Sequence, residues 1–215
     1  MHILNRSLYF PSVSLADEQG LLAIGGDLSP DRLLLAYRSG IFPWYNEEDP
    51  ICWWSPDPRC ILRPDALHVS KSMRRVLQDG RFTFRINHTF EHVIRSCQTV
   101  RRKEGNGTWI HEEMLDAYCR LHELGYAHSA ECWLNDELVG GLYGVRIGRV
   151  FFGESMFSTV SNASKFAFIN YVEKLSSEGV VLIDCQMQTD HLMSLGAEMM
   201  DRSLFIRLLK MECAG

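Results

Sequence analysis

The chain has 215 residues, of which 46% are hydrophobic and 23% are charged, the balance of a soluble globular protein with one large domain or two small ones. Its seven cysteines are scattered and include no C-x-x-C pair, which argues against a disulfide framework and against a zinc site. The first residues do not resemble a signal peptide, and no apolar run approaches the roughly 18 residues of a membrane span. We therefore expect a cytoplasmic protein that makes no use of a membrane.

The net charge of −5 is unevenly distributed along the chain. Residues 63–103 contain ten Lys or Arg residues and three acidic ones, whereas residues 104–215 contain eight basic and sixteen acidic residues. A basic segment beside an acidic remainder is typical of a protein that binds a phosphate backbone on one side. The alternative is an ordinary solvated charged face.

Residues 1–62 are rich in turn formers and aromatic residues, and they contain one clear helix. Ser29 is a candidate N-cap and Pro30 occupies the first helical position. Leu33, Leu34 and Tyr37 form an apolar face before Gly40, which predicts the end of the helix.

Three more helices are predicted in the middle of the chain. One begins at Ser70 and carries the cations Lys71, Arg74 and Arg75. A second begins after Thr89 and extends to residue 97, and a third covers residues 111–124 and is closed by a glycine.

From Ala127 the hydrophobic period changes from helical to alternating. Strands are predicted at 127–134, 138–145 and 150–156, with a helix from Asn162 or Ser164 to 178–179 and a buried strand at 180–186. This order predicts an α+β fold, with a C-terminal N-acetyltransferase-like (GNAT-like) acyltransferase domain and a smaller N-terminal α+β domain. We place the N-terminal lobe at 1–62, and the basic helical segment followed by the acyltransferase domain at 63–215.

Seven segments in this order resemble the leucyl/phenylalanyl-tRNA–protein transferase family. They are GLLAIGGDLS (20–29), GIFPW (40–44), WWSPDPR (53–59), GTWI (107–110), GESMF (153–157), NASK (162–165) and DCQ (184–186). The resemblance implies an aminoacyltransferase that moves Leu or Phe, with Met a third candidate, from aminoacyl-tRNA to the N-terminal amine of proteins beginning with Arg or Lys. That reaction marks the acceptor for degradation by the N-end rule (an N-degron). The tRNA ester is already activated, so no cofactor is expected. The sequence shows no heptad pattern of a coiled coil, and we expect a monomer.

The catalytic pair implied by the resemblance is Asp184 and Gln186. Residues i and i+2 of a strand point to the same side, so both side chains are expected to reach one substrate. An α-amine has a pKa of about 7.7–8.0, so its deprotonation near neutral pH is a modest demand. Asp184 is expected either to accept that proton or to orient the amine. From the residues alone, the favoured interpretation of Asp184 is a satisfied carboxylate at the end of a buried strand.

The resemblance also implies positions for the two substrates. Glu154, at a strand end, is expected to bind the acceptor peptide, because carboxylates pair with Arg and Lys. Trp44 and Trp109 match positions that stack around the 3′-adenosine of the tRNA. Core packing explains tryptophans equally well, and we interpret Trp53 and Trp54 as packing residues.

A pocket for the transferred amino acid and a surface for the tRNA backbone complete the expected site. The pocket is predicted from six side chains that are mostly apolar: Leu142, Met156, Phe168, Tyr171, Leu175 and Ile183. Lys71, Arg74 and Arg75 are predicted to contact tRNA phosphates. For each pocket residue taken singly, core packing is the competing interpretation.

The sequence offers one alternative function and argues against several others. Residues 102–107 match R-x-x-G-x-G, the pyrophosphate loop of acetyl-CoA-dependent acetyltransferases, which is the alternative function. The serine nucleophile motif fails because Phe157 stands where Gly is required, and Cys185 is expected to point into the core. His88 and His92 lack a third metal ligand. A non-enzymatic RNA-binding protein would leave the acidic strand ends without a role.

Overall fold

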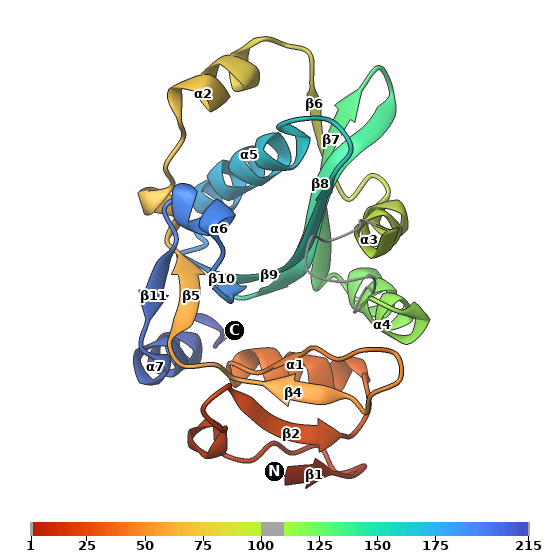
Figure 1. Cartoon of the computed structure of the whole chain (residues 1–215), viewed down its shortest axis with the longest axis vertical. Helices are drawn as coiled ribbons and strands as arrows, with labels where there is room; N and C mark the ends of the chain where they lie inside the picture. The colour runs from red at the N-terminus through yellow and green to blue at the C-terminus, as the bar shows by residue number, and fades with distance from the viewer. Residues whose placement is uncertain (1, 100–109, 215) are drawn as a thin grey trace.

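The computed structural model describes residues 2–99 and 110–214. It consists of a small N-terminal sheet and a seven-stranded sheet, each covered by helices (Figure 1). None of the described helices is long and apolar enough to cross a bilayer.

The N-terminal lobe has a four-stranded sheet in the order β1-β2-β4-β3. Its strands are β1 (His2–Leu4), β2 (Leu21–Gly25), β3 (Phe42–Pro43) and β4 (Cys52–Trp54). Helix α1 (Pro30–Arg38) packs beside this sheet and has Pro at its first position, as predicted. The Ser29 side chain, however, makes no capping hydrogen bond.

The larger sheet has the order β11-β5-β10-β9-β8-β7-β6. Its strands in chain order are β5 (Arg59–Leu62), β6 (Thr83–Ile86), β7 (Ala127–Leu134), β8 (Glu137–Ile147), β9 (Val150–Ser158), β10 (Leu182–Gln186) and β11 (Glu198–Met200). Strands β6 to β9 form an antiparallel meander, whereas β10 joins β9 in parallel. A helix between β9 and β10 makes this parallel pairing possible.

Helices cover both faces of the larger sheet (Figure 1). They are α2 (Lys71–Gln78), α3 (Phe90–Thr99), α4 (Glu112–Glu123), α5 (Ala163–Ser177), α6 (Asp190–Ser194) and α7 (Arg202–Glu212), with short 3-10 turns at Val13–Leu15 and Pro64–Ala66. Helix α5 lies on one face, and α3 and α4 lie on the other. The four helices predicted before residue 125 and the helix after residue 162 are thereby confirmed, with ends shifted by one to three residues.

Two buried clusters form the core. One contains side chains of the α5 face, and the other joins the N-terminal lobe to the α3–α4 face of the larger sheet. Tyr37 and Trp53 of the lobe belong to the same cluster as Tyr118 and Phe152. The interface between the lobe and the sheet is therefore continuous hydrophobic core.

A fully buried carboxylate fixes the start of α3. Glu131, on β7, accepts hydrogen bonds from the backbone N–H of Thr89 at 2.8 Å, from the Ser129 hydroxyl at 2.8 Å and from the Trp133 indole at 3.0 Å. These three donors satisfy a charge that would otherwise be costly to bury. The sheet, and not only the helix sequence, therefore sets where α3 begins.

The strands of the C-terminal half match their predicted ranges closely, but the lobe boundary does not coincide with a structural gap. Strand β5 lies inside the range 1–62 and pairs with β10 and β11 of the larger sheet. A domain division at residue 62 stays a prediction, and the polypeptide already enters the larger sheet at Arg59.

Candidate active site at the end of strands β9 and β10

The expected catalytic residues lie where β9 and β10 stop pairing. The last paired residues of these two strands are Asp184 and Phe152, and β9 continues to Ser158 beyond them. Both strands carry an irregularity here. Glu154 is the extra residue where β9 pairs with β8, and Cys185 is the extra residue where β10 pairs with β5. Such bulges bend a strand and redirect its side chains, and they are common beside active sites.

Asp184 is fully buried and is bound by Arg59 of β5 in a two-pronged ion pair. The Arg59 Nε donates to Oδ1 at 2.8 Å and Nη2 donates to Oδ2 at 2.7 Å. Each side chain has a relative exposure of 1% or less. A guanidinium fork matched to a carboxylate in this way is the strong form of the interaction.

Several parts of the fold hold Arg59 in place. Its guanidinium lies 4.7 Å from the ring centre of Phe42 and 4.9 Å from that of Phe205. Its Nη1 donates to the carbonyl oxygen of Gly40 at 3.2 Å. Gly40 has a φ of +72°, a left-handed conformation that favours glycine, and a Cβ there would meet Ile206 Cδ1 of α7 at 2.3 Å, so that side chain would have to move. Arg59 therefore connects the N-terminal lobe, α7 and the strand that carries Asp184.

Gln186 is connected to Asp184 through its backbone. Its N–H donates to Asp184 Oδ1 at 3.0 Å, and its φ of +56° lies in the left-handed region, which is uncommon for a residue other than glycine. Its side-chain Nε2 is buried and has no partner among the described residues. Because a register shift separates Asp184 from Gln186, the simple i, i+2 alternation behind the prediction is interrupted. Cys185 packs toward the core, as expected.

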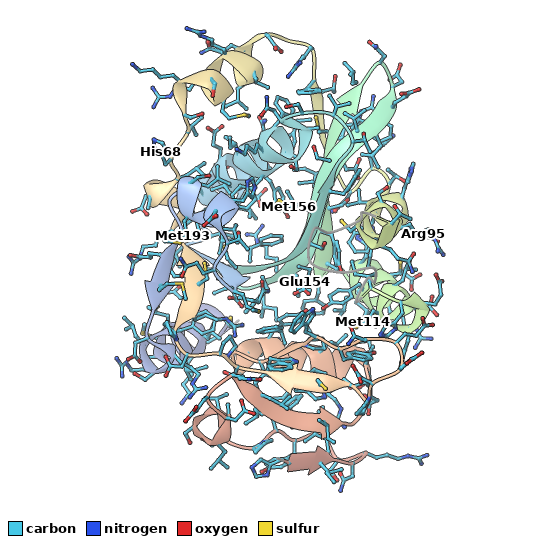
Figure 2. All side chains as sticks on the ribbon, viewed as in Figure 1. His68, Arg95, Met114, Glu154, Met156 and Met193 are labelled. Atoms are coloured by element: carbon cyan, nitrogen blue, oxygen red, sulfur yellow. The ribbon has the colours of Figure 1, made fainter. Side chains whose placement is uncertain are left out.

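Glu154 forms a ring of three hydrogen-bonding groups with two tyrosines. The Tyr37 hydroxyl of α1 donates to Oε1 at 2.8 Å, and the Tyr118 hydroxyl of α4 donates to Oε2 at 2.9 Å. The two hydroxyl oxygens are themselves 2.5 Å apart. Burial raises the pKa of Glu154 to about 7, although the hydrogen bonds from both tyrosines act in the opposite direction. Figure 2 places Glu154 between β9 and the N-terminal lobe.

The six residues predicted to line the amino-acid pocket are brought together on the α5 side of the larger sheet. Leu142, Phe168, Tyr171, Leu175 and Ile183 are each exposed by 4% or less, whereas Met156 is partly buried. Five of the six therefore pack in the core, and Met156 is the one with accessible surface. Met156 pairs directly with Leu142 across β8 and β9 and lies on the strand that carries Glu154 (Figure 2).

The two tryptophans predicted to stack on adenosine have different outcomes. Trp44 is 42% exposed and packs edge-on against Trp54, with ring centres 5.7 Å apart. Trp109 and the glycine-containing loop at 102–107 lie outside the described residues. Trp53 is fully buried and its indole donates to Gly25, as its packing role predicts.

The predicted tRNA-backbone residues lie on α2, which contacts the helix of the predicted amino-acid pocket, α5, but not the strand ends that carry Asp184 and Glu154. Lys71, Arg74 and Arg75 are exposed on α2, which lies at the far end of the molecule from the N-terminal lobe (Figure 1). The Ser70 hydroxyl caps this helix by accepting from the N–H of Met73 at 3.3 Å. The helix start is confirmed, and its three cations form an outer surface separate from Asp184.

Comparisons with known proteins cover nearly the whole chain. The family model described as "Leucyl/phenylalanyl-tRNA protein transferase" matches residues 61–210, and the model of its N-terminal domain matches residues 26–57. A protein named leucyl/phenylalanyl-tRNA–protein transferase from Flavobacterium johnsoniae is 55% identical over 98% of this chain and 99% of its own length. A protein of the same name from Desulfatibacillum aliphaticivorans is 54% identical over 97% and 90%.

The chain belongs to the leucyl/phenylalanyl-tRNA protein transferase family. It is an aminoacyltransferase, as the resemblance predicted. Among solved structures, L-PGS from Bacillus licheniformis matches with a TM-score of 0.42 and 14% identity, over 77% of this chain and 53% of that one. A GCN5-related N-acetyltransferase from Kribbella flavida matches with a TM-score of 0.41 and 10% identity, over 80% and 61%.

In this member of the transferase family, three residues at the site were not predicted from the sequence. In the sequence, Arg59 is the last residue of a motif and Tyr37 is part of an apolar helix face, and neither position indicates a role at the site. No motif contains Tyr118. A buried phenol on an apolar face usually has a hydrogen-bond partner, and a buried arginine beside an apolar strand needs a carboxylate. These two rules indicate that the tyrosines and Arg59 have polar partners, but not which ones.

Proposed function

We propose that this chain transfers Leu or Phe from aminoacyl-tRNA to the N-terminal amine of proteins that begin with Arg or Lys, in the cytoplasm and as a monomer. The observation that carries the proposal is the match to transferases of this name over nearly the full length of both chains. The modification would mark its acceptors for degradation. Because the ester is already activated, positioning and charge stabilisation are the main demands on the protein.

In this proposal, the catalytic end of β10 consists of Asp184 and Gln186, and the two residues have different roles. Both oxygens of Asp184 are bound by Arg59, and Oδ1 also accepts the Gln186 N–H. Asp184 therefore acts as a positioning residue that fixes the strained backbone of Gln186. The Gln186 amide, which has a buried nitrogen without a partner among the described residues, is the group that meets the substrates.

Glu154 is assigned to the acceptor because the groups that donate to its partly buried carboxylate, among the described residues, are neutral phenols. The positive N-terminal residue of an acceptor would supply the missing opposite charge. Met156, two residues along β9, is the accessible part of the proposed amino-acid pocket, and its flexible side chain suits both Leu and Phe. The core residues behind it would define the pocket's depth.

The tRNA would be held at two separated places. Trp44 offers an exposed aromatic face for the terminal adenosine, and the match of Trp109 to the same role stays a prediction. Helix α2 offers Lys71, Arg74 and Arg75 to the phosphate backbone. A tRNA is long enough to contact both ends of the protein at once.

A transfer assay tests the proposal directly. Purified protein is mixed with radiolabelled phenylalanyl-tRNA and a peptide that begins with Arg, without acetyl-CoA. Label should appear on this peptide and not on the same peptide with an acetylated N-terminus. If no label is transferred, while acetyl-CoA supports acetylation of an amine, the alternative acetyltransferase function is correct instead.

A matched pair of variants tests the site. Gln186→Ala should lower the rate of transfer strongly, whereas Gln188→Ala removes an exposed glutamine only two residues away and should leave it unchanged. Equal rates for the two variants would remove Gln186 from the catalytic end of β10.

A further inference from the structure

The ring formed by Glu154, Tyr37 and Tyr118 has fewer protons than contacts when Glu154 is charged. Three oxygen–oxygen contacts close the ring, at 2.8, 2.9 and 2.5 Å. Each tyrosine supplies one proton, and a carboxylate supplies none. If both phenols donate to Glu154, the contact between the two phenol oxygens has no proton. A third proton, carried by the carboxyl group of Glu154, would make each of the three contacts a hydrogen bond, with every group donating to the next one around the ring.

The two phenols are fixed as proton donors. Tyr37 and Tyr118 are fully buried, and burial together with the charge of Glu154 raises the pKa of each well above its usual value. They come from α1 and α4, so the ring is held by both the N-terminal lobe and the α3–α4 face. The only group of the ring that changes its protonation near neutral pH is therefore the carboxyl group of Glu154.

Asp184, the other carboxylate at this end of the sheet, is less suited to receive a proton. Its two oxygens already accept three hydrogen bonds, two of which come from the Arg59 guanidinium, and its residue is fully buried. Protonation would break an ion pair between two buried groups and leave the guanidinium charge unpaired. Glu154, by contrast, is partly buried, and its hydrogen-bond donors within residues 2–99 and 110–214 are both neutral.

We propose that Glu154 is the proton acceptor of the transfer reaction, and that Tyr37 and Tyr118 position it and complete the ring once it is protonated. This inference rests on the proposed function. It gives the carboxylate a second task beside attracting the acceptor's positive residue. It also leaves Asp184 with positioning alone.

The proton balance is simple. The acceptor's ammonium group loses one proton to Glu154, and the neutral amine attacks the ester carbon. The new C–N bond forms and a tetrahedral oxyanion results. When this intermediate collapses, the bond to the ribose oxygen breaks and the second proton of the attacking nitrogen goes to that oxygen. The net products are an amide, a free tRNA hydroxyl and one proton, which Glu154 returns to water.

The charged and titratable groups around Glu154 determine the expected pH dependence. Tyr37 faces it from α1, Tyr118 from α4, with Tyr143 of β8 behind Tyr118 at a ring distance of 5.3 Å. The negative charge of Asp184 raises the pKa of Glu154 further and the positive charge of Arg59 lowers it. Glu154 is a carboxylate above pH about 7, so the transfer rate should rise with pH through this range.

The test compares two acceptors in single-turnover reactions with phenylalanyl-tRNA. One is a peptide beginning with Arg. In the other, an aminooxy group replaces the α-amine, and this much less basic nucleophile is already neutral at pH 7. At pH 7, Glu154→Gln should slow transfer to the first peptide about 5- to 10-fold, because only that share of an α-amine with a pKa of about 7.7–8.0 is neutral without the base, and it should slow transfer to the second by less than about 2-fold. Glu137→Gln, an exposed glutamate on β8, is the matched control and should change neither rate.

The outcomes separate this inference from the proposed function. If the wild-type protein transfers nothing, the proposed function fails. If it transfers and Glu154→Gln slows both acceptors equally, or only raises the KM for the acceptor, Glu154 binds the acceptor without taking its proton and the inference is overturned.

Tyr118→Phe and Tyr37→Phe provide a second test should Glu154→Gln fold poorly. Each variant removes one donor to the charged carboxylate and also opens the ring of the protonated state, so the pH–rate profile should move away from that of the wild type. An unshifted profile for both variants would contradict the positioning role of the tyrosines.

Discussion

Replacing Arg59 with Met should destabilise the whole protein, because it leaves the charge of Asp184 buried and unpaired. The ion pair is enclosed, with relative side-chain exposures of 1% and 0%, so solvent screening does not reduce the effect. Removing one partner of a buried pair costs about 3–5 kcal/mol, out of a total stability of about 5–15 kcal/mol for a folded protein. Loss of the hydrogen bond to Gly40 and of the contacts with Phe42 and Phe205 adds to this.

The pairwise part of this effect can be isolated with a double-mutant cycle. Arg59→Met, Asp184→Asn and the double variant are unfolded in urea, and the transition is followed by tryptophan fluorescence and by circular dichroism. The double variant has no unpaired charge, so it should be more stable than Arg59→Met, with a coupling energy on the order of 3 kcal/mol, the upper part of the range for residues in contact. A coupling energy below about 0.5 kcal/mol would refute the argument that the two charges depend on each other.

Three further outcomes are expected. Glu131→Gln should lower the free energy of unfolding by about 1–3 kcal/mol, because one of the three donors to this buried side chain loses its acceptor. Urea unfolding measures this free energy. A change within error would mean that a water molecule replaces the lost acceptor. Trp44→Ala should weaken aminoacyl-tRNA binding roughly 5- to 150-fold without changing stability, as loss of one stacking partner does. Neutralising Lys71, Arg74 and Arg75 together should reduce the salt dependence of tRNA binding by about three units of slope, whereas neutralising Arg207 and Lys210 on α7 serves as the control; equal slopes in filter binding would place the tRNA elsewhere.

Much of the C-terminal fold could be predicted because its strands are long and alternate clearly. The turn at Asn135 and Asp136 shows why, since both residues have positive φ, as a tight hairpin requires. The strands of the N-terminal lobe have two to five residues, too few for a period to be recognised. Strand β5 could not be predicted for a second reason. All four of its residues are buried, so it shows no alternation at all.

The sequence predicts several residues of the site, but not the contacts that join them. Asp184 and Gln186 do lie together, yet the bulge at Cys185 replaces side-chain alternation with a backbone hydrogen bond. Nothing in a single sequence indicates such an extra residue. The partners Arg59 and Tyr37 are separated from the residues they bind by 125 and 117 positions, and only the folded chain brings them together.

The same separation has a consequence for the time at which activity can first appear during synthesis. Asp184, the partner of Arg59, is synthesised 125 residues later. At the usual rates of translation this delay is about 6–25 s. During that interval Arg59 and the apolar face of α1 lack the partners that later bury them, so the nascent lobe cannot complete its core. Neither half of the chain can therefore carry partial activity, and a truncated translation product should be a target for proteolysis and not a slow enzyme.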